Sequence, residues 1–247
     1  MKNLDLIFPD IHGRKFWREY VEKYLDKVNH IIFLGDYVDP YEQEKYENPE
    51  NMEEDLIEEL KDIIKLKKEY PDKVILLLGN HDCHYIWDNF VDSSRYNKIY
   101  SYQYFNIFKQ NIFLFNFAWV ENNYIFTHSG ITNSWGKDVQ EYVMNKKEDY
   151  NLLEVAKYLA AENNPSSFLI QLLGSCSFYR GGWKDNGSCM WADVREHFNF
   201  DGTPIKYPYY QIFGHTQLTE PIITDTWACL DCRKAFLLED GKLTICK

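Results

Sequence analysis

The chain has 247 residues, of which 45% are hydrophobic and 26% charged, a composition typical of a globular protein with a substantial core. Its formal net charge of −11 argues against a surface that holds nucleic acid, because such a surface needs an excess of Lys and Arg. No apolar run reaches the roughly 18 residues of a membrane span, and the N-terminal residues lack a signal-peptide profile. We therefore expect one domain over residues 1–247 in the cytoplasm, with neither a membrane nor a nucleic acid as a stable partner.

The first half of the chain alternates strand and helix patterns. Short apolar runs predict strands at 4–8, 31–34 and 74–78. Helical spacing of apolar residues predicts helices at 15–26 and 53–69, and a polar segment with two prolines predicts a surface loop at 40–50. This alternation favours parallel strands with helices on both faces of the sheet. In such sheets, ligands bind beyond the carboxyl ends of the strands.

The second half is less regular. Residues 134–161 have a mainly helical pattern, and residues 174–189 are rich in Gly and Ser, which predicts a long loop. Further strands are predicted at 112–117, 124–127, 209–213, 221–225, 227–230, 234–238 and 243–246. We find no internal repeat, low-complexity segment or linker, which supports the prediction of one domain.

Five short polar motifs each follow a predicted strand. In chain order they are Asp10-x-His12, Gly35-Asp36-x-x-Asp39, Gly79-Asn80-His81-Asp82, His128-Ser129-Gly130 and Gly214-His215-Thr216. Each motif alone is weak, because a His or a Gly-Asp pair after a strand is commonly an ordinary loop. Chance does not readily place ligand-type residues at five strand ends, however. Carboxylate, imidazole and amide groups together suit manganese, iron or zinc, whereas a pure calcium or magnesium site seldom uses three histidines.

The order of these motifs resembles the calcineurin-like metallophosphoesterase superfamily. Within it, the G-D-Y-V-D and G-N-H-D segments look like the phosphoprotein (serine/threonine) phosphatase branch, including its bacterial and phage members. The resemblance extends from residue 10 to about residue 235. It implies an α/β fold in four layers, an α/β/β/α sandwich with two central mixed β-sheets flanked by helices. The implied activity is the metal-dependent hydrolysis of phosphate monoesters.

The resemblance also implies a role for each motif residue. Asp10 and His12 match ligands of a first metal, and Asp36 matches the carboxylate that bridges two metals. The residues that match the other ligands of the second metal are Asn80, His128 and His215. The implied cofactors are two divalent ions, with manganese expected first and iron or zinc as alternatives. They would produce a hydroxide that attacks phosphorus directly, without a phospho-enzyme.

A further pair of residues matches the acid catalyst of the family. His81 matches a histidine that binds no metal and protonates the leaving oxygen, and Asp39 matches the carboxylate that orients this histidine and raises its pKa. The alternative for His81 is an ordinary loop histidine. Its position directly after Asn80 favours the catalytic role.

The sequence departs from the family pattern at two positions. Pro40 stands where the branch has an arginine that grips phosphate, and proline cannot replace a guanidinium group. Gln217 stands where many relatives have a further histidine ligand, so it is a weaker candidate metal ligand. The candidates for the missing arginine are Arg95, Arg180 and Arg195, with Arg14 as a further possibility. The segment Met190-Trp191-Ala192-Asp193 resembles one near the substrate arginine of the family, which favours Arg195.

Other functions stay open at this point. A dinucleoside-polyphosphate hydrolase or a phosphodiesterase could use the same metals, and a scaffold could keep the fold without catalysis. Retention of the six main ligands and of His81 argues against a scaffold. The sequence does not distinguish among a phosphoprotein, a nucleotide and a small molecule as the substrate, and it carries no signal for the oligomeric state.

Overall fold

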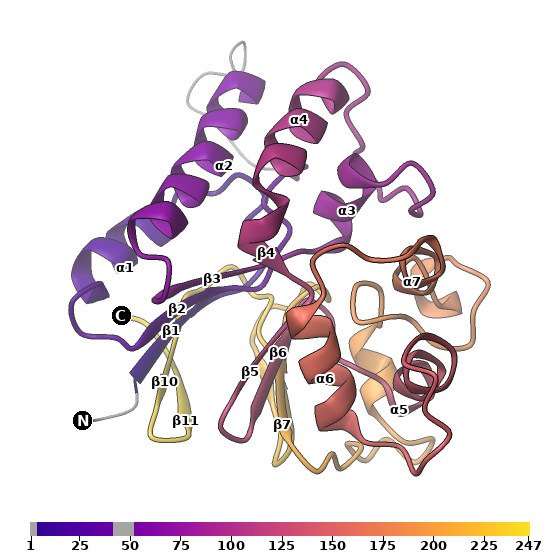
Figure 1. The fold of residues 1–247 in the computed structure, drawn as a ribbon. Helices are drawn as coiled ribbons and strands as arrows, with labels where there is room; N and C mark the ends of the chain where they lie inside the picture. Colours follow the sequence, from indigo (N-terminus) through magenta and orange to yellow (C-terminus); the bar gives the residue numbers. More distant parts are fainter. Residues whose placement is uncertain (1–3, 42–51) are drawn as a thin grey trace.

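Two β-sheets form the centre of the protein (Figure 1). The computed structural model describes residues 4–41 and 52–247. The first sheet has six strands in the order β11-β10-β1-β2-β3-β4, with the bounds Lys242–Ile245, Phe236–Glu239, Leu4–Phe8, His30–Phe33, Val74–Leu77 and Phe115–Asn116. Strands β1 to β4 are parallel, whereas β10 is antiparallel to β1, and β11 to β10. The sheet is therefore mixed.

The second sheet has five strands in the order β5-β6-β7-β9-β8, with the bounds Ala118–Glu121, Tyr124–Thr127, Tyr210–Phe213, Trp227–Cys229 and Ile222–Ile223. Strand β6 is parallel to β7, and β7 to β9, while β5 and β8 run antiparallel at the two edges. This sheet is also mixed, which confirms the predicted pair of mixed sheets.

Helices cover the outer face of each sheet (Figure 1). Those over the first sheet are α1 (Trp17–Tyr24), α2 (Met52–Glu69) and α4 (Ser101–Asn111). Those on the side of the second sheet are α5 (Asn133–Asp138), α6 (Leu152–Ala161) and α7 (Ser167–Leu173). The predicted four-layer α/β/β/α sandwich is confirmed. Within the described ranges, no helix is long and apolar enough to cross a membrane.

The alternation of side chains along β1 shows why both of its faces are apolar. Ile7 belongs to the apolar cluster between the two sheets, which also contains Phe126 and Ile212 of the second sheet. Its neighbours Leu6 and Phe8 point the other way, into the cluster beneath the helices. Successive side chains of a strand face opposite sides, so a strand buried on both faces reads as a continuous apolar run. This burial fixes the strand ends from which the polar motifs emerge.

Several predicted elements differ from the structure. The predicted strand at 112–117 begins as a 3₁₀ turn, Ile112–Leu114, and only Phe115–Asn116 pairs as β4. The predicted helical stretch 134–161 consists of α5, a π-helical turn at Val139–Val143, a break, and α6. The G-N-H-D segment runs into a helix that was not among the predicted elements, α3 (Asn80–Ile86). Most of the predicted loop at 40–50 lies outside the described residues.

Candidate metal centre

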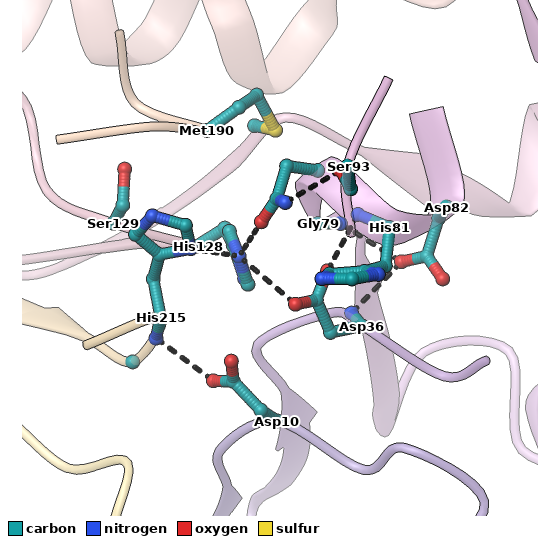
Figure 2. A network of polar contacts seen from close by, with 12 residues as sticks. Asp10, Asp36, Gly79, His81, Asp82, Ser93, His128, Ser129, Met190 and His215 are labelled. Carbon is teal, nitrogen blue, oxygen red and sulfur yellow. Dashed lines mark hydrogen bonds and ion pairs between the residues drawn. The ribbon is translucent and has the colours of Figure 1, made fainter. Parts of the chain in front are cut away.

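The motif residues meet at one edge of the two sheets. Each follows the carboxyl end of a strand, namely β1, β2, β3, β6 or β7. Figure 2 shows the Asp36 carboxylate between His81 and His128, with Asp10 and His215 below and to one side. The side chains that come together, all buried, are Asp10, His12, Asp36, Asn80, His81, His128 and His215. The sequence therefore identified one site from five separate segments.

Asp36 links two groups of metal-ligand type. Its Oδ2 lies 3.5 Å from Nε2 of His12 and 3.5 Å from Nε2 of His128. One group of potential ligand atoms joins Asp36 with His12 and His81, and the other joins it with His128 and His215. Asp10 lies next to the first group, because its Oδ2 is 4.0 Å from Nε2 of His12. Its Oδ1 accepts a hydrogen bond of 2.9 Å from the backbone N–H of His215.

Backbone carbonyls fix the tautomers of two histidines. Nδ1 of His12 lies 2.8 Å from the carbonyl oxygen of Val38, and Nδ1 of His128 lies 2.9 Å from that of Leu34. A carbonyl oxygen can only accept, so each Nδ1 carries the proton, and Nε2 of the neutral ring carries a lone pair. Both lone pairs face Asp36. A hydrogen bond to the far ring nitrogen is the usual way to orient a metal-binding histidine.

The surroundings of His128 fit a bound cation. Its Nε2 lies 2.9 Å from Oδ1 of Asn80 and 3.1 Å from Nδ1 of His215, in addition to Oδ2 of Asp36. The Asn80 amide is held in this orientation because its Nδ2 donates to Oγ of Ser93 at 2.7 Å. With the His128 ring neutral and Asp36 ionised, only Nδ1 of His215 can carry a proton among these atoms. A divalent cation bound here would be coordinated by these acceptor atoms, which otherwise repel one another.

Electrostatics keep the centre ready for cations at neutral pH. Burial lowers the pKa of His12 to about 3, so the ring is neutral. Burial opposes ionisation of Asp36, but His128 and His81, together with the hydrogen bond from the backbone N–H of His81, hold its pKa well below the usual value. Burial and the nearby Asp36 charge raise the pKa of Asp10. A cation beside Asp10 would reverse this effect.

A buried carboxylate that the motif analysis left without a role ties two loops of the centre together. Asp82 accepts hydrogen bonds from the backbone N–H groups of Asp36, Tyr37 and Gly79, at 2.9, 2.9 and 2.8 Å. These bonds join the loop after β2 to the start of α3. They also satisfy buried donors that the sheet does not pair. The last residue of the G-N-H-D motif is therefore structural.

Two motif glycines allow the carboxylates to lie against the backbone. A Cβ atom at Gly79 would lie 2.1 Å from Oδ1 of Asp36, and one at Gly214 would lie 2.2 Å from Oδ1 of Asp10. No side chain fits at such distances without displacing the carboxylate. Steric exclusion therefore explains why glycine precedes Asn80 and why glycine precedes His215.

Several residues of the centre have left-handed backbone conformations. The φ angles of His12, Asp36, Asp39 and His215 are 45°, 53°, 57° and 66°. Such angles are uncommon outside glycine, and they concentrate at functional sites where surrounding contacts impose them. Here they turn the side chains inward directly after the strands.

His81 and Asp39 form a second buried unit beside the centre. Nδ1 of His81 lies 2.8 Å from Oδ2 of Asp39. The same carboxylate accepts a hydrogen bond of 2.6 Å from the hydroxyl of Tyr85, and Nε2 of His84 lies 2.9 Å from it. Burial would raise the pKa of Asp39, but the contacts with His81 and His84 hold it below the usual value. Asp39 is therefore ionised beside His81.

A cavity of about 620 Å³ opens next to His81, and its wall includes Asn80, Arg95 and Arg180. Nη2 of Arg95 lies 3.2 Å from Nε2 of His81, and the guanidinium carbon stacks 3.8 Å from the ring centre of Tyr41. Nη2 of Arg180 donates to the carbonyl oxygen of His215 at 3.2 Å. The structure thus brings Arg95 and Arg180 to the centre.

The other arginine candidates lie differently. Arg195 is 58% exposed, donates to Asp193 at 2.6 Å and stacks on Tyr179, and it is absent from the described residues that line the cavity. The sequence favoured Arg195, but its exposed position depends on the path of the loop, which the pattern does not give. Arg14 donates to the carbonyl oxygen of Asp10 at 3.0 Å, behind the carboxylate.

Gln217, the weaker ligand candidate, is exposed. In the amide orientation that satisfies both partners, its oxygen accepts hydrogen bonds from Nε and Nη2 of Arg233 at 3.1 and 2.7 Å. This contact uses the atom that would bind a metal. Its ligand role stays a prediction.

A model of the calcineurin-like phosphoesterase family matches residues 6–217. The chain belongs to this family. No curated protein matches the sequence of this phosphoesterase at a significant level. It is a hydrolase of phosphate esters, and the family implies divalent metal ions, which the buried groups of His and Asp could hold.

Solved structures share the fold of this phosphoesterase. A cold-active protein tyrosine phosphatase from a Shewanella species matches with a TM-score of 0.61 and 14% identity, over 98% of this chain and 77% of that protein. A further structure of a cold-active protein tyrosine phosphatase has a TM-score of 0.59 and 15% identity, over 98% and 78% of the two chains. A mutant of a cold-active protein tyrosine phosphatase has a TM-score of 0.59 and 16% identity, over 98% and 77% of the two chains.

The substitution Gly214→Ala tests the steric role of this glycine. We expect about 10- to 100-fold weaker metal binding, because the new Cβ displaces the Asp10 carboxylate. Titration of the metal-free protein with Mn²⁺ in a calorimeter measures this change. Gly174→Ala is the matched control, since a Cβ there would make only ordinary van der Waals contacts, at 3.5 Å or more, and lies outside the metal centre. Metal affinity in Gly214→Ala equal to that of the wild type would contradict the steric argument.

Proposed function

We propose that this phosphoesterase is a dinuclear phosphatase of phosphate monoesters, formed by one domain over residues 1–247. The observation that carries the proposal is the position of Asp36 between two sets of ligand atoms, with the His81–Asp39 pair beside them. One ion would be held by Asp10, His12 and Asp36. The other would be held by Asp36, Asn80, His128 and His215. Manganese is the first expectation, with iron or zinc as alternatives.

Divalent ions held in this centre would supply Lewis acidity, for the activation of water and for the neutralisation of charge on the phosphoryl oxygens. The chain itself supplies the proton for the leaving oxygen. Asp39 holds His81 through Nδ1, which directs Nε2 to the cavity wall and stabilises the protonated ring. His81 donates this proton to the leaving oxygen as the phosphorus–oxygen bond breaks.

Two guanidinium groups bind the phosphoryl group in this proposal. Arg95 lies beside His81 and Arg180 lies beside His215, and both line the wall of the same cavity. Nε of Arg95 is buried without a hydrogen-bond partner among the described residues, which leaves it for an oxygen of the substrate. When phosphate draws Nη2 of Arg95 away from His81, Nε2 of His81 takes up a proton from solvent, and this is the proton that passes to the leaving oxygen. Arg95 therefore takes the place of the arginine lost at Pro40.

The metal requirement is tested by removal and reloading. We expect the chelated protein to lose activity and to regain it with Mn²⁺, Fe²⁺ or Zn²⁺, at two ions per chain by elemental analysis. The assay includes a phosphopeptide, an aryl phosphate, a bis-aryl phosphate and a dinucleoside polyphosphate. Monoesters should be preferred. Preference for the bis-aryl phosphate or the dinucleotide would replace the proposal with the alternative class, and an active chelated protein would exclude the metal mechanism.

His81→Ala tests the acid. We expect kcat to fall by roughly 10²- to 10⁴-fold while two ions remain bound, because His81 moves a proton without holding a metal. The loss should be larger for alkyl than for aryl monoesters, since a poor leaving group depends more on protonation. His30→Ala is the control, as His30 lies at the opposite end of β2. A uniform loss on both ester types would remove His81 from the proton-transfer step.

Arg95→Ala tests the phosphate contact. We expect kcat/KM to fall about 10- to 100-fold, from the loss of charge-assisted hydrogen bonds to the phosphoryl group. Arg195→Ala should change kcat/KM by less than about twofold, because its guanidinium is exposed and paired with Asp193. A larger loss in Arg195→Ala than in Arg95→Ala would instead assign the phosphate contact to Arg195.

A further inference from the structure

We propose that the cavity beside His81 binds an aromatic leaving group, so that the preferred substrates are aryl phosphate monoesters of the phosphotyrosine type. This inference rests on the proposed function, in which His81 protonates the leaving oxygen. An acid must lie within hydrogen-bond reach of the oxygen that it protonates. The organic group attached to that oxygen therefore begins at His81, whose side chain forms part of the cavity wall.

The cavity is rich in aromatic side chains. Tyr41, Tyr179, Trp183 and Trp191 all line it. Trp183 is 89% exposed and Tyr179 is 52% exposed, although both belong to the wall of a concave site. Large aromatic surfaces left in water beside a cavity are a common mark of ligand binding. A planar ring could cover the exposed surface of Trp183 and the part of Tyr179 that the Arg195 guanidinium leaves exposed.

Trp191 adds an independent observation. Its side chain is only 7% exposed, yet its indole Nε1–H has no hydrogen-bond partner among the residues that the structure describes. A buried indole N–H usually finds an acceptor. The ring of Trp191 lies edge-on to that of His215, with 5.9 Å between centroids, so Trp191 connects the cavity with the metal centre. An oxygen of the bound ester is the acceptor that this position offers.

A short folded loop presents these groups. Between Cys176 and Lys184, the backbone N–H of Phe178 donates to the carbonyl oxygen of Lys184 at 3.0 Å, and that of Gly182 donates to Ser177 at 2.9 Å. A Cβ at Gly182 would lie 2.0 Å from the carbonyl oxygen of Cys176, so only glycine permits this close return. The loop is therefore ordered before substrate binds, which reduces the entropic cost of binding.

The order of residues in this loop favours an aryl ester over a nucleotide. Arg180, which we assign to the phosphoryl group, stands between Tyr179 and Trp183 in the loop. Because all three residues line the same cavity, a ring held against Tyr179 or Trp183 would lie beside the residue that holds the phosphoryl group. In an aryl phosphate the ring is attached directly to the leaving oxygen. In a nucleoside monophosphate a ribose separates the base from that oxygen.

The test compares phosphotyrosine and phosphoserine peptides of otherwise identical sequence, with the metal-loaded enzyme. Trp183→Ala should lower kcat/KM for the phosphotyrosine peptide about tenfold more than for the phosphoserine peptide, mainly through KM. The comparison of each variant with the wild type on the same peptide cancels the intrinsic reactivity of the ester. Trp183→Phe should restore most of the loss, and the exposed Phe200, outside the cavity, provides the control Phe200→Ala.

A binding measurement gives a second readout. Phenylphosphonate should inhibit the wild type more tightly than methylphosphonate, and Trp183→Ala should remove most of this difference. Equal losses on the two peptides, or a Trp183 effect confined to nucleoside monophosphates, would overturn the aryl subsite while leaving the phosphatase proposal intact. A metal-loaded wild type that hydrolyses no monoester would overturn both.

Discussion

The buried Asp36 carboxylate between Nε2 of His12 and Nε2 of His128 is the contact on which the site depends. The two imidazoles belong to different sheets, since His12 follows β1 and His128 follows β6. Asp36 can therefore touch both only if the two sheets pack with their strand ends level. The apolar cluster between the sheets, which contains Ile7 and Phe126, produces this packing. The packing of the two sheets therefore both buries the apolar cluster and brings the candidate ligands together.

The loops that hold Asp36 combine strain with compensation. A left-handed backbone at a residue other than glycine costs on the order of 1–3 kcal/mol, and Asp36, Asp39 and His12 all adopt it. The Asp82 carboxylate offsets part of this strain, because it accepts three hydrogen bonds from backbone N–H groups. Each of these bonds stabilises the fold by about 0.5–3 kcal/mol. Oδ1 of Asp36 also accepts the backbone N–H of His81 at 2.9 Å. Several hydrogen bonds therefore hold Asp36 in position without a bound ion.

The sequence allowed the strand ends and their ligand-type residues to be predicted, because apolar runs followed by polar motifs are local signals. It did not allow the supporting contacts to be predicted, because the partners are far apart along the chain. Ser93, which orients the Asn80 amide, is one example. His84 carried a usable signal, however. It lies three residues after His81 at the start of a helix, a spacing that places both rings on one side, where both meet Asp39.

The chain has a net charge of −11, yet its proposed substrates are anions, and the structure suggests how these facts coexist. Arg95 and Arg180 stand on the cavity wall next to a centre that would hold two divalent cations. Local charges in a concave, partly dry site act more strongly than the distant acidic surface, which salt screens over about 10 Å. The Asp39 charge lies behind His81, where it is matched by two imidazoles and a hydroxyl. An approaching phosphate group would therefore meet the guanidinium groups, and any divalent ion held in the centre, before it meets Asp39.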